Sequence, residues 1–274
     1  MLNFEDTSRS VELFGASIHY NEAGDGPVLF GFHGGGPGGN GWDNTKRSID
    51  MLSRNFRVIL MDLPGYGRSQ YVEANDGENR DELYARVLLA FMDKLAIDKA
   101  HFYGPSMSGA PVVYFAHAHP DRVLKLVLKC PPTGPNLLST SPPDGIMSLR
   151  VLSADPTREN TEKMMRLFIP KHGLLTEALI DDRFASVTQQ VGLAPPTKAA
   201  VGAANPLDLM PGLKMPVLVL WGHQDRMVPL DGALLALALI PDVRLHVWGG
   251  GTGHFIEFEH VEEFQELVSA FLLK

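Results

Sequence analysis

The stretch GPSMSG, residues 104–109, lies between two apolar runs of the chain. A serine flanked by small residues, after a strand and before a helix, is typical of the sharp turn that presents a nucleophile. Ser108 stands where the usual G-x-S-x-G pattern ends in glycine, but it is also small, and Gly109 follows it. We therefore expect Ser106 to be a nucleophile. The alternative is that Ser106 only caps a helix that starts near Met107.

A nucleophilic serine needs a base, and the base needs a carboxylate that orients it. Asp225 follows the apolar run 217–221, and His254 lies in a glycine-rich loop after the apolar run 243–247. Catalytic groups of open α/β sheets gather beyond the carboxyl ends of the strands. The order and placement favour a triad with Ser106 over the alternatives, a loop-capping aspartate and a surface histidine.

Short apolar runs alternate with helical patterns along the chain, which predicts an α/β fold with a mostly parallel sheet and helices on both faces. The runs expected as strands are residues 28–32, 56–61, 100–103, 123–128, 217–221 and 243–247. The clearest helical patterns are residues 81–95 and 261–273, and residues 11–13 and 17–20 suggest a hairpin.

The alternation stops between about residue 131 and residue 211, where stretches rich in proline and serine frame helical pieces at 160–168 and 176–187. No strand pattern occurs there. We expect an α/β core formed by residues 1–133 and 211–274, with a helical lid over residues 134–210.

Composition narrows the range of functions. A net charge of -8 disfavours nucleic acid and anionic membranes as partners, and favours a small-molecule substrate. The longest apolar runs, such as 233–240, are shorter than the about 20 residues that span a bilayer. Cys130 is the single cysteine, and residues 1–6 lack a signal-peptide pattern, so we expect a cytoplasmic protein. Because His117 and His119 point to different helix faces and no H-E-x-x-H occurs, no metal site is expected.

A glycine run, residues 34–39, has two interpretations. It contains G-x-G-x-x-G, and Asp62 follows about 20 residues later, as in a dinucleotide site. Pro37 interrupts that motif, and a hairpin precedes the strand. A glycine-rich loop can instead present a backbone N–H to an oxyanion, together with the N–H of Met107. Because His33 leads the run, we favour the oxyanion interpretation.

Three stretches together carry a family resemblance: residues 33–44, 62–69 and 253–264. They resemble the meta-cleavage product hydrolases, α/β-hydrolases that split carbon–carbon bonds in the diketones formed by aromatic ring fission. The glycine run with Trp42 and Asn44 is the most specific part. The resemblance implies an α/β-hydrolase fold and no cofactor.

Residue by residue, the resemblance implies Ser106, Asp225 and His254 as the triad. It also implies the backbone N–H groups of Gly35 and Met107 as the oxyanion hole.

Substrate contacts are implied for Gly36, Asn44 and Arg183, the arginine facing a carboxylate of the substrate. An arginine suits a planar carboxylate through two parallel hydrogen bonds. The alternative for Arg183 is a solvent-exposed side chain paired with Asp181 or Asp182.

Two departures concern the substrate. Pro105 stands where the family usually has an asparagine, and Phe255 where it usually has a tryptophan; both are candidate substrate-binding positions. The expected activity is cleavage of a C–C bond in a 2-hydroxy-6-oxo-dienoate or related diketone. The alternatives are a carboxylesterase or lactonase with the same triad, a Rossmann-type oxidoreductase, and a non-catalytic binding protein. The resemblance also implies a homo-oligomer, a dimer or larger.

Overall fold

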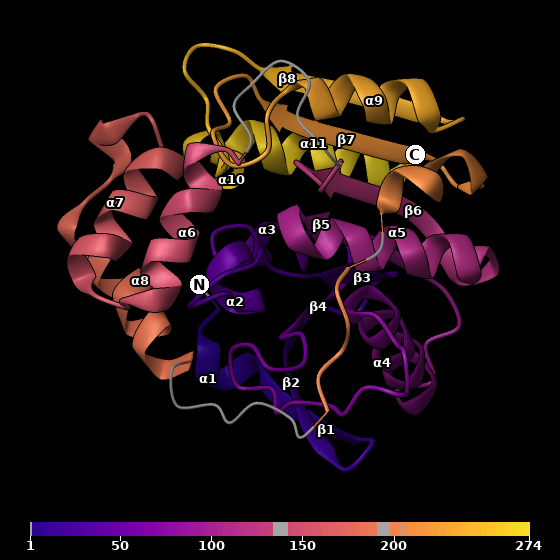
Figure 1. The fold of residues 1–274 in the computed structure, drawn as a ribbon. Coiled ribbons are helices and arrows are strands. Elements are labelled where there is room, and N and C mark those ends of the chain that lie inside the picture. The colour runs from indigo at the N-terminus through magenta and orange to yellow at the C-terminus, as the bar shows by residue number, and fades with distance from the viewer. Residues whose placement is uncertain (1, 134–141, 191–197, 204) are drawn as a thin grey trace.

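The computed structural model describes residues 2–133, 142–190, 198–203 and 205–274, and its centre is one eight-stranded sheet (Figure 1). The strand order is β1-β2-β4-β3-β5-β6-β7-β8. Strand β2 runs antiparallel to β1 and β4, and all other pairs are parallel. The predicted strands and hairpin are confirmed. The strands are β1 (Ser8–Leu13), β2 (Ala16–Ala23), β3 (Val28–Gly31), β4 (Arg57–Met61), β5 (Ala100–Pro105), β6 (Val123–Lys129), β7 (Val217–Gly222) and β8 (Val243–Trp248).

Helices connect the parallel strands, and both predicted long helices are present. The helices are α1 (Phe4–Thr7), α2 (Gly41–Thr45), α3 (Ile49–Leu52), α4 (Arg80–Lys94), α5 (Gly109–Ala118), α6 (Asp144–Ala154), α7 (Arg158–Phe168), α8 (Glu177–Gln190), α9 (Asp231–Leu239), α10 (Ile256–Glu259) and α11 (Val261–Leu273). Helix α4 begins at a capping box, in which Asn79 and Glu82 each accept the other's backbone N–H. His119, expected on a helix with His117, lies just beyond the end of α5. Among the described residues, we find no helix with the length and apolar character needed to span a membrane.

Helices cover both faces of the sheet. Consecutive side chains of a strand point to opposite faces. On β5, the ring of Phe102 contacts Phe115 of α5, and the next ring, Tyr103, contacts Phe264 of α11. Helices α5 and α11 therefore lie on opposite faces, as the alternating sequence pattern predicts.

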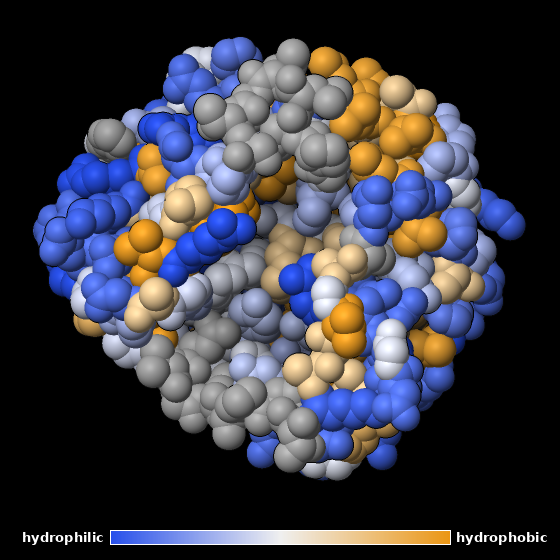
Figure 2. Space-filling view, in the orientation of Figure 1, coloured by the Kyte–Doolittle hydropathy of each residue, from blue (hydrophilic) through white to orange (hydrophobic). Residues whose placement is uncertain are grey.

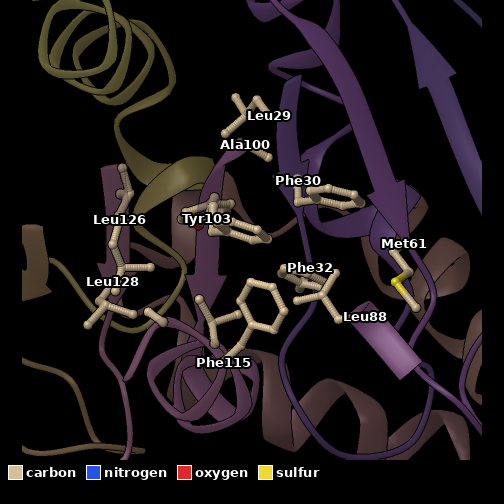
Figure 3. Close-up of a cluster of buried hydrophobic side chains, with 14 of the residues drawn as sticks. Leu29, Phe30, Phe32, Met61, Leu88, Ala100, Tyr103, Phe115, Leu126 and Leu128 are labelled. Atoms are coloured by element: carbon tan, nitrogen blue, oxygen red, sulfur yellow. The ribbon is translucent and has the colours of Figure 1, made fainter. Parts of the chain in front are cut away.

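The core beside β5 is built from stacked aromatic rings (Figure 3). Phe30, Phe32 and Phe102 all pack against one another with nearly parallel ring planes, and their centroids are 5.4 to 6.5 Å apart. All three side chains are buried. Because β3 and β5 are neighbours, this packing fixes the relative position of the two strands whose ends carry the glycine run and Ser106.

Helices α6, α7 and α8 are the α-helices of the described residues between β6 and β7, and they stand together at one side of the sheet (Figure 1). We call these three helices the helical insertion. The pieces expected at 160–168 and 176–187 correspond to α7 and α8, whereas α6 was not expected. The expected lid boundary at residue 134 lies outside the described residues, which exclude 134–141.

His101 on β5 makes the fold sensitive to acid. Its ring packs edge-on against Phe56, its Nδ1 is buried without a hydrogen-bond partner, and burial lowers the pKa of His101 from 6.5 to about 4. As pH falls below 6.5, the unfolded chain binds a proton that the folded protein does not, so stability decreases until pH reaches about 4. We expect a His101→Phe variant to lose less stability in this window, measured by urea unfolding at pH 7, 6, 5 and 4. Parallel losses in both proteins would contradict this prediction.

Candidate active site

Ser106 sits on a strained turn directly after β5. Its φ angle is +52°, which a serine adopts at a cost of roughly 1–3 kcal/mol. A Cβ added to Gly104 would lie 3.2 Å from the Cα of Gly109, so the turn requires the small residues that the sequence provides. The hydroxyl of Ser108 donates to the carbonyl of Pro105 at 2.9 Å and ties the turn together. Residues 106–108 form a 3₁₀ turn and α5 starts at Gly109, two residues later than expected.

Asp225 and His254 come together beyond the ends of β7 and β8. His254 Nδ1 lies 2.7 Å from Asp225 Oδ2, and the other carboxylate oxygen accepts the N–H groups of Met227 and Val228 at 2.7 and 2.9 Å. Burial by itself raises the pKa of Asp225, but the imidazole of His254 and the N–H of Val228 lower this pKa by more. An ionised Asp225 fixes the proton on Nδ1, so Nε2 is the nitrogen free to act as a base.

Ser106 and His254 line one pocket. Among the described residues, the side chains of Ser106 and His254 form no hydrogen bond with each other. In enzymes without substrate such bonds are often long, and they tighten when a substrate binds. The other residues that line the pocket are Gly34, Gly35, Asn44, Phe168, Arg183, Met227 and Phe255. The predicted triad residues and most predicted binding residues are thus neighbours in space.

A second compartment adjoins this pocket and shares Asn44, Arg183 and Phe255 with it. Its remaining lining comes from α7 and α8, from Phe258 of α10, and from Asp43 and Lys46 at the end of α2. The helical insertion therefore supplies much of the wall against which a substrate would lie.

The glycine run approaches the Ser106 turn closely. A Cβ added to Gly35 would lie 3.1 Å from Met107 Sδ, and one added to Gly34 would lie 3.5 Å from Ser106 Cβ. This packing places Gly34 and Gly35 beside the side chains of Ser106 and Met107. Two backbone N–H groups near a nucleophile are the elements of an oxyanion hole.

The ring of His33 forms hydrogen bonds at the start of the glycine run. The sequence did not predict this role. Its Nε2 accepts the N–H of Leu63 at 3.0 Å, so the proton is on Nδ1, which donates to the Gly34 carbonyl at 2.8 Å. Burial lowers the pKa of His33 and keeps the ring neutral. His33 is therefore a support for the loop and not a second base.

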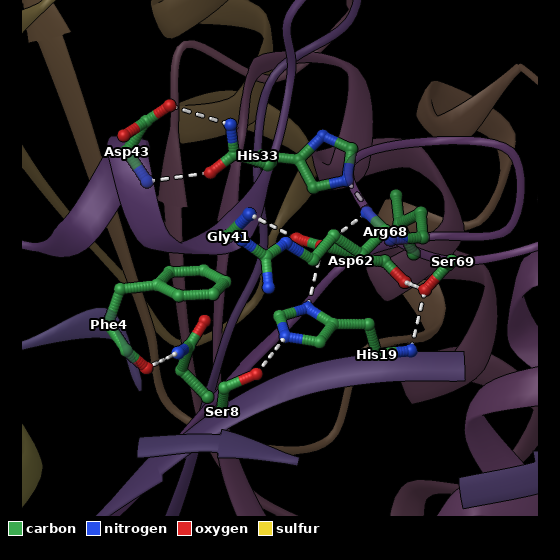
Figure 4. Close-up of polar contacts among 12 residues, drawn as sticks. Phe4, Ser8, His19, His33, Gly41, Asp43, Asp62, Arg68 and Ser69 are labelled. Carbon is green, nitrogen blue, oxygen red and sulfur yellow. Dashed lines mark hydrogen bonds and ion pairs between the residues drawn. The ribbon is translucent and has the colours of Figure 1, made fainter. Parts of the chain in front are cut away.

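Asp62, the residue that a dinucleotide site would need, is already engaged (Figure 4). Its Oδ1 accepts the N–H of Gly41 at 2.7 Å, and its Oδ2 lies 2.8 Å from His19 Nδ1 and 3.0 Å from the N–H of Arg68. The side chain is buried, so neither oxygen is available to a ribose. The dinucleotide interpretation of the glycine run is wrong, and Asp62 instead fixes the start of α2.

Arg183 on α8 points into the pocket and not to solvent. It donates to the carbonyls of Gly38 and Pro37 at 2.7 and 3.2 Å, and its Nε is buried without a hydrogen-bond partner. The exposed-residue alternative is wrong, because the two neighbouring aspartates have other partners. Asp181 pairs with Arg158 and Asp182 with Lys46.

Two predicted binding residues do not line either compartment. Gly36 packs against Leu149 of α6, where an added Cβ would meet a methyl group at 2.6 Å. Pro105 is buried at the end of β5, with its carbonyl bonded to Ser108. The structure therefore gives neither residue a pocket-lining position.

Phe168, the last residue of α7, was not predicted from the sequence but belongs to the site. Its ring lines the pocket, and its carbonyl accepts the N–H groups of His254 and Phe255 at 2.9 and 3.2 Å. The helical insertion is thus bonded directly to the loop that carries His254. Apolar spacing in α7 indicated a buried face but not this backbone contact.

Cys130 lies beside Asp225 and His254, and the possible ligand atoms of the three residues are all within 4.8 Å of one another. Burial raises the pKa of the Cys130 thiol well above its usual value, so the sulfur stays protonated. Because metal ions bind thiolate and the other two side chains are engaged with each other, this group suits a hydrogen-bonded pair better than a metal.

The strand order, the sharp turn at Ser106 and the paired Asp225 and His254 define the chain as an α/β-hydrolase. Residues 27–161 match the family model described as alpha/beta hydrolase fold. The chain is 38% identical, over 265 residues, to a 2-hydroxy-6-oxononadienedioate/2-hydroxy-6-oxononatrienedioate hydrolase from a Pseudomonas species. That alignment covers 94% of this chain and 92% of the relative.

A second relative is the 2-hydroxy-6-oxo-6-phenylhexa-2,4-dienoate hydrolase of Burkholderia cepacia, 36% identical over 93% of this chain and 91% of the relative. The chain therefore belongs to the family of meta-cleavage product hydrolases. A solved structure, the meta-cleavage product hydrolase from Pseudomonas fluorescens IP01, has a similar fold, with a TM-score of 0.83 at 24% identity and coverage of 97% and 98% of the two chains.

Proposed function

We propose that this enzyme hydrolyses the C–C bond of a 2-hydroxy-6-oxo-dienoate or a related diketone formed by aromatic ring fission. The observation that carries the proposal is one pocket that contains Ser106, His254 and Arg183. A nucleophile, its base and a cation for a carboxylate are what such a substrate requires. The names of both relatives point to substrates of this class.

In the proposed reaction, His254 first assists the proton transfer that converts the dienol to its keto tautomer. Ser106, or a water activated by the same pair, then adds to the ketone carbon, and the backbone N–H groups of Gly35 and Met107 bind the oxyanion. Collapse of the oxyanion breaks the C–C bond, and the dienolate leaving group takes the proton that His254 removed from the nucleophile. Where Ser106 is the nucleophile, a water activated by His254 then hydrolyses the acyl-enzyme ester and frees Ser106. With one water consumed, the products are a carboxylic acid and a 2-hydroxydienoate. No metal or cofactor takes part in this scheme.

Arg183 is proposed to bind the dienoate carboxylate, with Asn44 and Phe255 as neighbouring walls. For a carboxylate substrate we expect Arg183→Gln to raise KM by about 10- to 100-fold, since a hydrogen bond to a charged group contributes about 1.5–3 kcal/mol. Steady-state kinetics on a ring-fission product measures this effect. A neutral p-nitrophenyl ester serves as the control, and its KM should change little. Equal effects on both substrates would contradict the assignment.

Ester or lactone hydrolysis is the second candidate function, because Pro105 offers neither a polar side chain nor a backbone N–H. A direct comparison tests the two candidates. We expect the enzyme to remove the visible absorbance of a ring-fission product with a higher kcat/KM than it shows for a p-nitrophenyl ester. Turnover of the ester alone would favour the second candidate and leave the triad assignment in place.

Three further proposals concern the lid, the cellular compartment and the oligomeric state. We infer that the helical insertion is the lid over the site and that the enzyme is a cytoplasmic homo-oligomer. The single, buried Cys130 supports a reducing compartment. Leu234 and Leu237 on α9 are exposed. An apolar area, orange at the upper right of Figure 2, lies over α9 and supports contact between subunits. Light scattering coupled to size exclusion would give the subunit number.

A further inference from the structure

Lys129 and Glu257 form an ion pair buried beside the candidate active site. Lys129 is the last residue of β6, and its Nζ lies 2.7 and 2.8 Å from the two carboxylate oxygens of Glu257 on α10. The two residues are 0% and 3% exposed. Removing two charges from water is costly, and such a pair is weak evidence for added stability. Its position suggests another role.

The pair lies immediately behind the segment that carries His254. Helix α10, with Glu257, directly follows His254 and Phe255 in the chain. Two contacts described above also hold this segment. The His254 imidazole bonds to Asp225, and the backbone N–H groups of His254 and Phe255 donate to the carbonyl of Phe168 in the helical insertion. The ion pair between Lys129 and Glu257 connects α10 to β6 of the central sheet.

Lys129 also touches the wall of the pocket from behind. Its Nζ lies 5.3 Å from the ring centroid of Phe255, and the Phe255 ring lines both compartments. Neither Lys129 nor Glu257 lines either compartment itself. An effect of the pair on the reaction must therefore pass through His254 or Phe255.

We propose that Lys129 and Glu257 are positioning residues for His254. The ion pair holds α10 against the end of β6, so that His254 Nδ1 stays on Asp225 while Nε2 faces Ser106. This proposal rests on the proposed triad but not on the identity of the substrate. A displacement of about 1 Å at a catalytic base can cost about 100-fold in rate, so a remote tie of this kind can have a large effect.

The test replaces both charges with apolar side chains of similar size, in the variant Lys129→Met/Glu257→Leu. Such replacements of buried ion pairs often preserve folding, whereas removing one partner leaves a lone buried charge. The matched control is Arg57→Met/Glu22→Leu, which removes the ion pair between β4 and β2, at 2.5 Å, away from the pocket. A second variant, Glu257→Gln, keeps the shape of the side chain and an oxygen that can accept from Lys129 Nζ, but it leaves the lysine charge without a counter-ion, so its melting temperature is measured beside its kinetics.

Two readouts separate positioning from a purely structural role. The first is kcat and KM for p-nitrophenyl acetate, which requires only the triad. The second is the low-field proton NMR signal of His254 Nδ1–H bonded to Asp225. We expect the double variant to lower kcat at least about tenfold with KM changed less than about threefold, and to broaden or shift the signal. Glu257→Gln should give a smaller change in the same direction, and the control should match the wild type.

A lower melting temperature with wild-type kcat and an unchanged NMR signal, in either variant, would overturn the proposal and leave the pair a structural one. Both readouts work without a ring-fission substrate. If the enzyme fails to cleave such substrates, the proposed function falls while this proposal is still tested.

Discussion

Replacing Ser106 with alanine is expected to lower kcat for a ring-fission product by at least about 10³-fold, because the nucleophile of a hydrolase triad cannot be supplied by its partners. The strained φ angle of Ser106 and its place in the pocket with His254 are the structural reasons. Stopped-flow absorbance of the dienolate measures the rate. The same variant should no longer react with a fluorophosphonate.

A neighbouring serine provides the control for this experiment. Ser108→Gly restores the usual glycine at the end of the turn pattern and removes the CH2OH side chain, whose hydroxyl bonds the Pro105 carbonyl. We expect this variant to retain at least about a tenth of the wild-type rate, since the turn keeps its small residues. A Ser106→Ala variant that is as active as Ser108→Gly would show that Ser106 is not the nucleophile.

Replacing Asp225 with asparagine is expected to lower kcat by about 10⁴-fold with little change in KM. The amide keeps the size of the side chain, but it can donate to His254 Nδ1 and so place the imidazole proton on Nε2. A histidine with that tautomer cannot take a proton from Ser106. Steady-state kinetics and the rate of fluorophosphonate labelling both measure the loss.

The exposed Asp242 on the loop before β8 supplies a matched surface variant, Asp242→Asn, which should behave as the wild type. If Asp225→Asn lost less than about tenfold, orientation of His254 by Asp225 would not limit the reaction.

Local features of the sequence predicted most of the fold and the placement of the three candidate triad residues. The apolar runs of the sheet, the small residues around Ser106 and the loops with Asp225 and His254 are each readable within a few neighbouring positions. The structure places all three residues beyond the carboxyl ends of parallel strands, where the sequence predicts them.

Contacts between segments that are distant in the chain could not be predicted from the sequence. The Lys129–Glu257 pair joins residues 128 positions apart, and the spacing of neither residue marks it. The direction of Arg183 depends on how α8 packs against the glycine run. Gly36 and Pro105 were assigned by resemblance alone, and the structure does not place them in the pocket lining.

The central claim is that this pocket hydrolyses a C–C bond, and product analysis in ¹⁸O-labelled water tests it most directly. The wild-type enzyme is mixed with a purified 2-hydroxy-6-oxo-dienoate, with Ser106→Ala alongside. The account predicts a carboxylic acid that carries ¹⁸O from water and an equal amount of a 2-hydroxydienoate, detected by mass spectrometry in the wild-type reaction only. Recovery of the intact dienoate, with a p-nitrophenyl ester hydrolysed in the same preparation, would contradict it.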